Sequence, residues 1–124
     1  KRQLVFYGQR IWSFLDRLDD DTRDKLEWTL ELIRTLDRIP IKYFKHLEGT
    51  DGLFEIRTEW MNQAVRIFCF FDEGTMIILV HGFIKKEQKT PKPELDLAKE
   101  RLKRLKGINE KKNIGSDFDD FLMD

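Results

Sequence analysis

The first forty residues show two hydrophobic patterns: a short continuous run, followed by apolar residues at helical spacing. The run QLVFY at residues 3–7 predicts a short strand. Two sets of apolar residues then recur every three or four positions and predict a helical hairpin: Ile11, Phe14, Leu15 and Leu18, followed by Leu26, Leu30, Ile33 and Leu36. The acidic cluster DDDT separates the two sets, so Asp20 or Asp21 is expected to cap the second helix. Pro40 is expected to prevent its continuation.

Three later segments are rich in aromatic and β-branched residues: GLFEIRTEW, AVRIFCFF and TMIILVHGFIK. The short breaks MNQ and DEG separate them, which predicts an antiparallel meander. A last amphipathic stretch, ELDLAKERLKRL, predicts a C-terminal helix that ends at Gly107. The expected fold is therefore α+β, with an N-terminal strand and helical hairpin packed on a small antiparallel sheet and a C-terminal helix. We expect one domain over residues 1–107 and an acidic tail over residues 108–124.

The turns between the strands predict which side chains face each other. If residues 73–74 (Glu-Gly) form a two-residue turn, Arg66 lies opposite His81. If residues 61–62 (Met-Asn) form another, Arg57 lies opposite Arg66. The three cations would then form one row on one face of the sheet. A three-residue loop would break this arrangement, because side chains alternate between the two faces.

Such a row of like charges needs compensation. One source is a bound anion. The alternative is an ordinary surface charge ladder with Glu55 and Glu59, which share a face with Arg57. Lys85 shares the face of His81, and the lysine-rich stretch HGFIKKEQKTP begins there, which favours a concave cationic surface that binds an anion.

Composition narrows the class of protein. The 124 residues are 40% hydrophobic and include fifteen aromatic residues, enough for one core. The single cysteine, Cys69, excludes a disulfide framework, and two histidines with scattered carboxylates offer no metal-ligand spacing, so we expect neither metal nor cofactor. Apolar stretches fall short of membrane-spanning length and the first residues lack a signal-peptide core. We therefore expect a cytoplasmic protein without membrane contact.

The formal net charge of zero conceals an asymmetry along the chain. Residues 81–106 carry nine basic side chains against four acidic ones, whereas residues 107–124 carry five acidic against two basic. A polyanion can therefore bind the body of the protein despite the neutral total. The acidic and aromatic ending SDFDDFLMD also raises the hypothesis that the tail folds against the cationic groove.

Several segments, in this order behind the helical hairpin, resemble the HigB-like, phage-derived branch of the RelE/ParE toxin superfamily: GLFEIR, RIFCFF, ILVHGFIKKEQKTP and ELDLAKERLKRL. The likeness covers about residues 4–106, and HGFIKKEQKTP is its most specific part. The resemblance implies a type II toxin that cuts messenger RNA on the translating ribosome without a metal. It also implies a helix-turn-helix, HigA-like antitoxin as partner.

The resemblance matches five positions to the cationic groove of the family: Arg57, Arg66, Lys85, Lys86 and Lys89. Arg57 and Arg66 are expected to clamp the phosphate, while His81, Lys85 or Lys86 transfers protons. For His81, a structural role at the end of a strand is the alternative. Further residues are expected to contact RNA: Lys45, His46, Lys86, Lys89 and Lys92.

One departure from the family pattern leaves other functions open. Phenylalanine stands at positions 54, 68 and 70, where relatives often carry tyrosine, and no tyrosine follows Tyr43. A catalytic tyrosine is therefore missing from the late strands. Two alternatives remain: a ParE-like inhibitor of DNA gyrase and a catalytically silent RNA-binding module.

Overall fold

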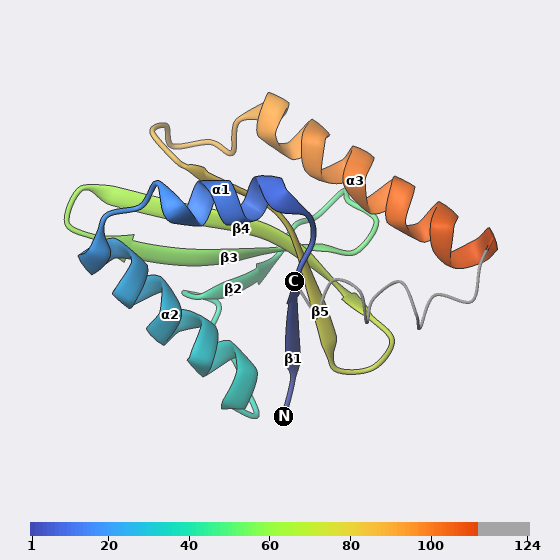
Figure 1. The fold of residues 1–124 in the computed structure, drawn as a ribbon, viewed down its shortest axis with the longest axis horizontal. Coiled ribbons are helices and arrows are strands. Elements are labelled where there is room, and N and C mark those ends of the chain that lie inside the picture. Colours follow the sequence, from blue (N-terminus) through green and yellow to red (C-terminus); the bar gives the residue numbers. More distant parts are fainter. Residues whose placement is uncertain (112–124) are drawn as a thin grey trace.

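The computed structural model describes the backbone of residues 1–111 and the side chains of residues 1–107. The elements follow one another as β1 (Gln3–Phe6), α1 (Gln9–Asp16), α2 (Asp20–Thr35), β2 (Phe44–His46), β3 (Leu53–Trp60), β4 (Gln63–Asp72), β5 (Met76–Ile84) and α3 (Lys92–Lys111). The strands form one five-stranded sheet in the order β1-β5-β4-β3-β2 (Figure 1). All neighbours are antiparallel except β1 and β5, which are parallel. The predicted α+β class is confirmed.

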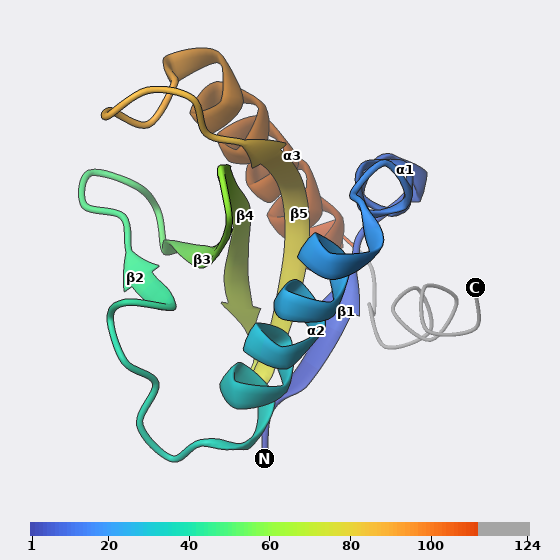
Figure 2. The same cartoon turned by 90° about the vertical axis from the view of Figure 1, so that its left-hand side faces the viewer.

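Helices cover both faces of the sheet, which gives three layers (Figure 2). One hydrophobic cluster joins α1 and α2 to sheet residues such as Ile67 and Cys69. The other joins α3 to Phe68 and Phe70. This division follows from the alternation of side chains along β4, whose neighbouring residues point to opposite faces. A strand buried on both faces explains why RIFCFF is almost continuously apolar.

The helical hairpin forms as predicted, but its cap differs. Asp19 is the N-cap of α2, and its carboxylate accepts a hydrogen bond of 2.8 Å from the Thr22 backbone N–H. The expectation of Asp20 or Asp21 is therefore wrong; both lie in the first helical turn, where their charges suit the positive end of the helix dipole. The helix ends at Thr35, so Leu36 continues the predicted stripe in sequence but lies outside the helix.

The register prediction is correct for one hairpin and wrong for the next. In the β3–β4 hairpin Arg57 lies opposite Arg66, as predicted. In the β4–β5 hairpin Asp72 pairs with Met76, so three residues form the loop instead of two. Together with an irregularity further along the two strands, this loop places Arg66 opposite Phe83, and His81 opposite a phenylalanine of β4 rather than Arg66.

An irregularity in the pairing of β4 with β5 nevertheless returns His81 to the predicted face of the sheet, the one that carries Arg57 and Arg66. Phe68 pairs with His81 while Cys69 pairs with Leu79, so one residue of β5, Val80, has no partner on β4. The longer loop reverses the alternation and the extra residue reverses it again. His81 therefore shares a face with the two arginines, but it lies two positions before Phe83, the residue of β5 that faces Arg66.

The C-terminal helix is longer than predicted. Helix α3 runs to Lys111, so the expected stop at Gly107 is wrong. The Pro91 carbonyl accepts from the Leu95 N–H at 3.1 Å, which fixes the start of the helix after the lysine-rich corner. The remainder of the predicted acidic tail, residues 112–124, lies outside the described residues. Each described helix is too short or too polar to cross a lipid bilayer.

Candidate functional site

The brevity of β2 leaves part of β3 without a neighbouring strand. Strand β2 pairs only with residues 54–56, so residues 57–60 of β3 lie at an edge of the sheet. The segment that leads into β2 runs beside this edge, because the Arg57 N–H donates to the Tyr43 carbonyl at 2.9 Å. A pocket with a volume of about 440 Å³ opens between this edge, α2 and the segment before β2.

Four cationic side chains, one tyrosine and one carboxylate line this edge pocket: Lys25, Lys42, Tyr43, Arg57, Glu59 and Arg66. They come from α2, from the segment before β2, and from β3 and β4. Arginine and lysine from separate parts of the chain therefore converge on one cavity, which gives it a positive potential. A phosphate is the ligand that suits such a lining.

Arg66 occupies the most buried part of this group. Its side chain is only 6% exposed and pairs with Glu59 at 3.0 Å, while the same guanidinium donates to the Val65 carbonyl. Its Nε is buried and has no hydrogen-bond partner within the described residues. The Glu59 side chain is 68% exposed and is free to rotate into solvent, so an anion can replace it without moving the sheet.

Arg57 is held by a different carboxylate. Its Nε lies 3.2 Å from Glu55 Oε1, and the Glu55 side chain is 2% exposed. The charge ladder that the sequence offered as an alternative is therefore present, since each arginine of the pair has a carboxylate partner. Coulombic repulsion between Arg57 and Arg66 is reduced by these contacts, and a bound anion must compete with Glu59 in particular.

An aromatic surface adjoins the cations of the edge pocket. Trp28 and Tyr43 meet edge to face with ring centroids 5.7 Å apart, and Trp28 is 46% exposed. The ammonium group of Lys25 lies 3.9 Å from the centroid of Trp28, and that of Lys42 lies 5.4 Å from the centroid of Tyr43. Exposed rings beside cations can stack with nucleobases while the cations hold the backbone.

His81 is engaged by two side chains of α3. Its Nε2 lies 2.6 Å from Glu94 Oε1, and its Nδ1 lies 3.1 Å from the Arg101 guanidinium. Since a guanidinium can only donate, Nδ1 accepts and Nε2–H donates, which defines the neutral imidazole. Burial lowers the pKa of His81, while the hydrogen bond to Glu94 opposes that shift. Both ring nitrogens are occupied, which favours the structural alternative for His81.

The lysine-rich corner lies along the end of β5. The Lys85 N–H donates to the Ala64 carbonyl at 2.8 Å, so this lysine continues the pairing of β5 with β4. By alternation its side chain lies on the face of Arg66. Lys86 lines a different cavity, together with His81 and Glu94. Lys89 is exposed in the loop that follows.

The other predicted RNA contacts lie apart from the edge pocket. Lys45 and His46 are exposed on β2, where Lys45 faces Glu55 and His46 packs against Phe54. Lys92 is exposed at the start of α3 and pairs with Asp96 at 3.4 Å. Of all the predicted site residues, the edge pocket brings together only two arginines, those of β3 and β4.

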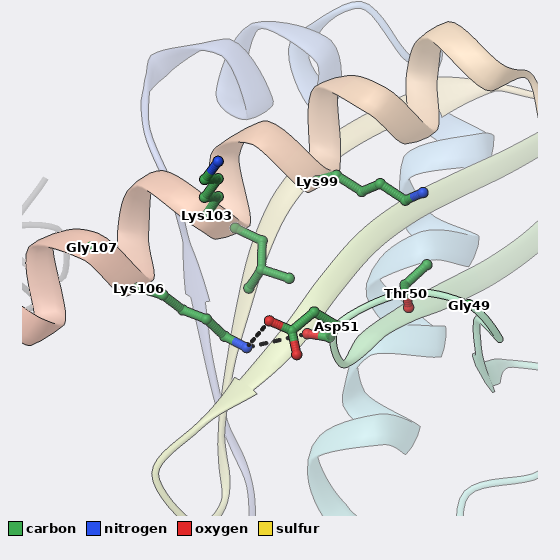
Figure 3. Close-up of a pocket in the computed structure, with 8 residues that line it drawn as sticks. Gly49, Thr50, Asp51, Lys99, Lys103, Lys106 and Gly107 are labelled. Carbon is green, nitrogen blue, oxygen red and sulfur yellow. Dashed lines mark hydrogen bonds and ion pairs between the residues drawn. The ribbon is translucent and has the colours of Figure 1, made fainter.

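Helix α3 borders a further cavity of about 620 Å³ with the β2–β3 loop. Lys99, Lys103 and Lys106 line it from the helix (Figure 3). Lys106 reaches across to Asp51, with its ammonium 3.0 Å from the carboxylate. This contact ties the helix to the loop, so part of the charge predicted for the cationic helix has a structural partner.

Sequence reasoning missed three residues of the edge pocket: Lys25, Lys42 and Tyr43. The two lysines lie in segments whose sequence pattern predicts secondary structure but gives no indication of a binding site. Tyr43 precedes the three long strands in the sequence, whereas the family pattern places its catalytic tyrosine within the late strands. Within the described residues no group of three metal-ligand side chains comes together.

The fold and the edge pocket define a small α+β protein whose five-stranded sheet presents paired arginines beside an aromatic surface. The chain matches the family described as phage-derived protein Gp49-like (DUF891) over residues 13–103, and it belongs to that family. This family is related to the RelE/ParE toxins. No curated protein matches the chain.

Proposed function

We propose that this protein is the HigB-like toxin of a type II toxin–antitoxin system, a ribosome-dependent endoribonuclease that inhibits translation. The observation that carries the proposal is the convergence of four cations, with Tyr43, on one pocket beside the exposed ring of Trp28. A neutral chain with such a local concentration of positive charge is suited to a polyanion. A helix-turn-helix, HigA-like antitoxin is the expected partner.

The proposed reaction is transesterification of RNA without a metal. The ribose 2′-oxygen attacks the adjacent phosphorus and loses its proton, while the bond to the 5′-oxygen breaks and that oxygen gains a proton. The products are a 2′,3′-cyclic phosphate and a free 5′-hydroxyl. Arg57 and Arg66 would stabilise the charge that grows on the phosphoryl oxygens, with the unpartnered Nε of Arg66 as one donor.

The proton transfers fall to groups other than His81 in this proposal. Both nitrogens of that imidazole are held by α3, whereas Tyr43 and Lys42 line the pocket itself. Lys85 lies on the same face as Arg66 and is the third candidate. A tyrosine in the early part of the chain would replace the one that the late strands lack.

One observation favours the silent RNA-binding module as the second candidate. The carboxylates of Glu55 and Glu59 already neutralise the two arginines, which suits a surface that binds a phosphate weakly and releases it unchanged. A gyrase inhibitor that acts through protein contacts has less need of cations that converge in a pocket. A supercoiling assay with DNA gyrase tests it directly.

Cleavage of a reporter mRNA in a translation extract, mapped by primer extension, tests the proposal. The wild-type chain is expected to cut the message only when ribosomes translate it. Arg57→Gln and Arg66→Lys are expected to lower cleavage at least about a hundredfold, because a planar fork is lost from the phosphate in each case. Arg38→Gln removes an exposed arginine outside the pocket and serves as the control for charge.

Circular dichroism and thermal denaturation establish that each variant folds. Full cleavage by folded Arg57→Gln and Arg66→Lys would refute the assignment of the pocket. A wild-type chain that binds RNA but never cuts it would establish the silent module instead. Inhibited supercoiling without any cleavage would favour the gyrase inhibitor.

A further inference from the structure

A second cationic cleft lies at the opposite edge of the sheet. Strand β1 pairs with β5 only over residues 76–79, so residues 80–84 of β5 have no strand beyond them. Helix α1 packs against this stretch from one face and α3 from the other (Figure 2). A cavity of about 390 Å³ lies between the two helices, with His81 and Gly82 among its lining residues.

Three arginines line this α1–α3 cleft: Arg10 from α1, Arg17 directly after that helix, and Arg101 from α3. No carboxylate is among the lining residues. Across residues 1–107, none of the three guanidinium groups forms an ion pair. Burial and then the charge of Arg10 lower the pKa of Arg101, so the like charges are close enough to repel each other.

Two carboxylates border the adjoining cavity, and both already have partners. Glu94 accepts from His81 at 2.6 Å, and Asp19 caps α2 by accepting from the Thr22 N–H. Neither carboxylate is paired with an arginine of the cleft. Glu100 and Tyr7 offset part of the charge of Arg101, but among the described side chains no carboxylate forms an ion pair with an arginine of the cleft.

Arg101 is fixed in place before any ligand arrives. One of its terminal nitrogens donates to the Val80 carbonyl at 2.6 Å and contacts His81 Nδ1 at 3.1 Å. The remaining donors of this guanidinium make no hydrogen bond with the described residues. An arginine anchored on one side and unpaired on the other loses little side-chain entropy when it binds an anion.

The first turn of α1 adds to the positive potential. Its N-cap, Gly8, offers no side-chain acceptor and takes φ 84, and no acidic residue occupies the first turn. Gln9, the first residue of the helix, lines the cleft. The N-terminal end of this helix, with the partial positive charge of its free amide groups, therefore borders the cavity that holds the arginines.

We propose that the α1–α3 cleft binds a phosphate group, either of a small phosphate ester or of an RNA backbone. Three guanidinium forks can supply donors to several oxygens of one tetrahedral anion, and a phosphate offsets more of their charge than a single carboxylate does. In this arrangement His81 is a positioning residue that orients Arg101. The site is separate from the edge pocket and does not depend on ribonuclease activity.

Amide NMR of the full chain, titrated with inorganic phosphate at constant ionic strength, tests the proposal. Saturable shifts are expected at the amides of Gly82 and Leu97, which line the cleft. Arg10→Gln and Arg17→Gln are each expected to weaken binding about tenfold, the effect of losing one charge-assisted contact. The matched control Arg38→Gln removes the same charge elsewhere and is expected to leave the affinity unchanged.

A second titration uses a short single-stranded RNA to identify the source of the phosphate. Tighter binding of the RNA than of inorganic phosphate, lost in Arg10→Gln, supports a backbone phosphate. Equal binding of both supports a small phosphate ester. Equal affinity in Arg10→Gln, Arg17→Gln and Arg38→Gln, or no saturable shift at the cleft with millimolar phosphate, would overturn the proposal. If the wild-type chain binds phosphate at the cleft but does not cleave mRNA, the proposed function would be refuted and the phosphate site would stand.

Discussion

Replacement of Gly82 by alanine tests the packing of α1 on the sheet. A Cβ at this position would lie 2.5 Å from Cδ2 and 2.7 Å from Cε2 of the Phe14 ring. The ring belongs to the core cluster and is only 6% exposed, so it has little room to move away. The glycine of the HGFIKKEQKTP stretch is thus explained by close approach of a helix, not by chemistry at a catalytic centre.

The expected loss of stability can be estimated from this contact. Overpacking in a core costs roughly 1–3 kcal/mol, and lower entropy of the unfolded chain returns about 0.4–1 kcal/mol of it. We therefore expect Gly82→Ala to lower the free energy of unfolding by about 1–2 kcal/mol. With an unfolding entropy of about 2.1 cal/mol/K per residue, this lowers Tm by about 4–8 °C.

Thermal and urea denaturation followed by circular dichroism provide the measurement. Gly107→Ala is the matched control, because Gly107 lies inside α3 with no atom within 4 Å of the added Cβ. The same chemical change should there raise the free energy of unfolding by about 0.5–1 kcal/mol. The two substitutions are therefore predicted to have opposite signs.

A smaller side chain at position 14 identifies the cause. In a Phe14→Leu background the penalty of Gly82→Ala should shrink by about 1 kcal/mol or more, since the two residues are in direct contact. A Gly82→Ala variant as stable as wild type would refute the reasoning, because the Phe14 ring would then move aside without any loss of folding free energy. An equal penalty in both backgrounds would place the strain elsewhere.

Two further predictions concern a helix cap and a buried histidine. Asp19→Ala is expected to lower the urea midpoint, because the Thr22 N–H loses its acceptor, whereas Asp20→Ala should change it little; the reverse order would contradict the observed cap. Burial lowers the pKa of His81, so the unfolded chain takes up its proton first. Stability should therefore be intact above pH about 6.5 and fall as the pH is lowered through the folded pKa, by at most about 1.4 kcal/mol per unit for one proton. Urea denaturation between pH 7.5 and 5 should show a weaker slope in His81→Gln than in His46→Gln; equal slopes would refute the assignment to His81.

The elements of the fold were predictable because their signals are local. Helical spacing and aromatic runs identified the helical hairpin, the three long strands and the last helix. The register of β3 with β4 followed from a two-residue turn, in which Met61 adopts φ 56. The β4–β5 loop has three residues, and the compensating irregularity lies beside Val80, inside a run of apolar residues. Nothing in such a run distinguishes a regular strand from one with an extra residue.

The composition of the edge pocket was only partly predictable for a different reason. Arg57 and Arg66 could be paired from strand alternation alone. Lys25 and Tyr43 reach the same cavity because α2 and the segment before β2 pack beside the sheet edge. That juxtaposition depends on tertiary packing, which no pattern within either segment encodes. Strand alternation and the pKa of an imidazole favoured His81 for proton transfer, but both of its ring nitrogens contact side chains of α3.

Short outer strands account for both cationic cavities. Strand β1 pairs over residues 76–79 and β2 over residues 54–56, although β5 and β3 each continue several residues further. An unpaired stretch of strand exposes backbone groups that can recruit another chain, and charged side chains at that point oppose such pairing. In this protein arginines meet at both exposed stretches, and residues of α1, α2 or α3 line the cavity beside each of them. The same arrangement leaves a positively charged cavity beside each edge, so the protection of the edges and the proposed anion binding would have a common structural origin.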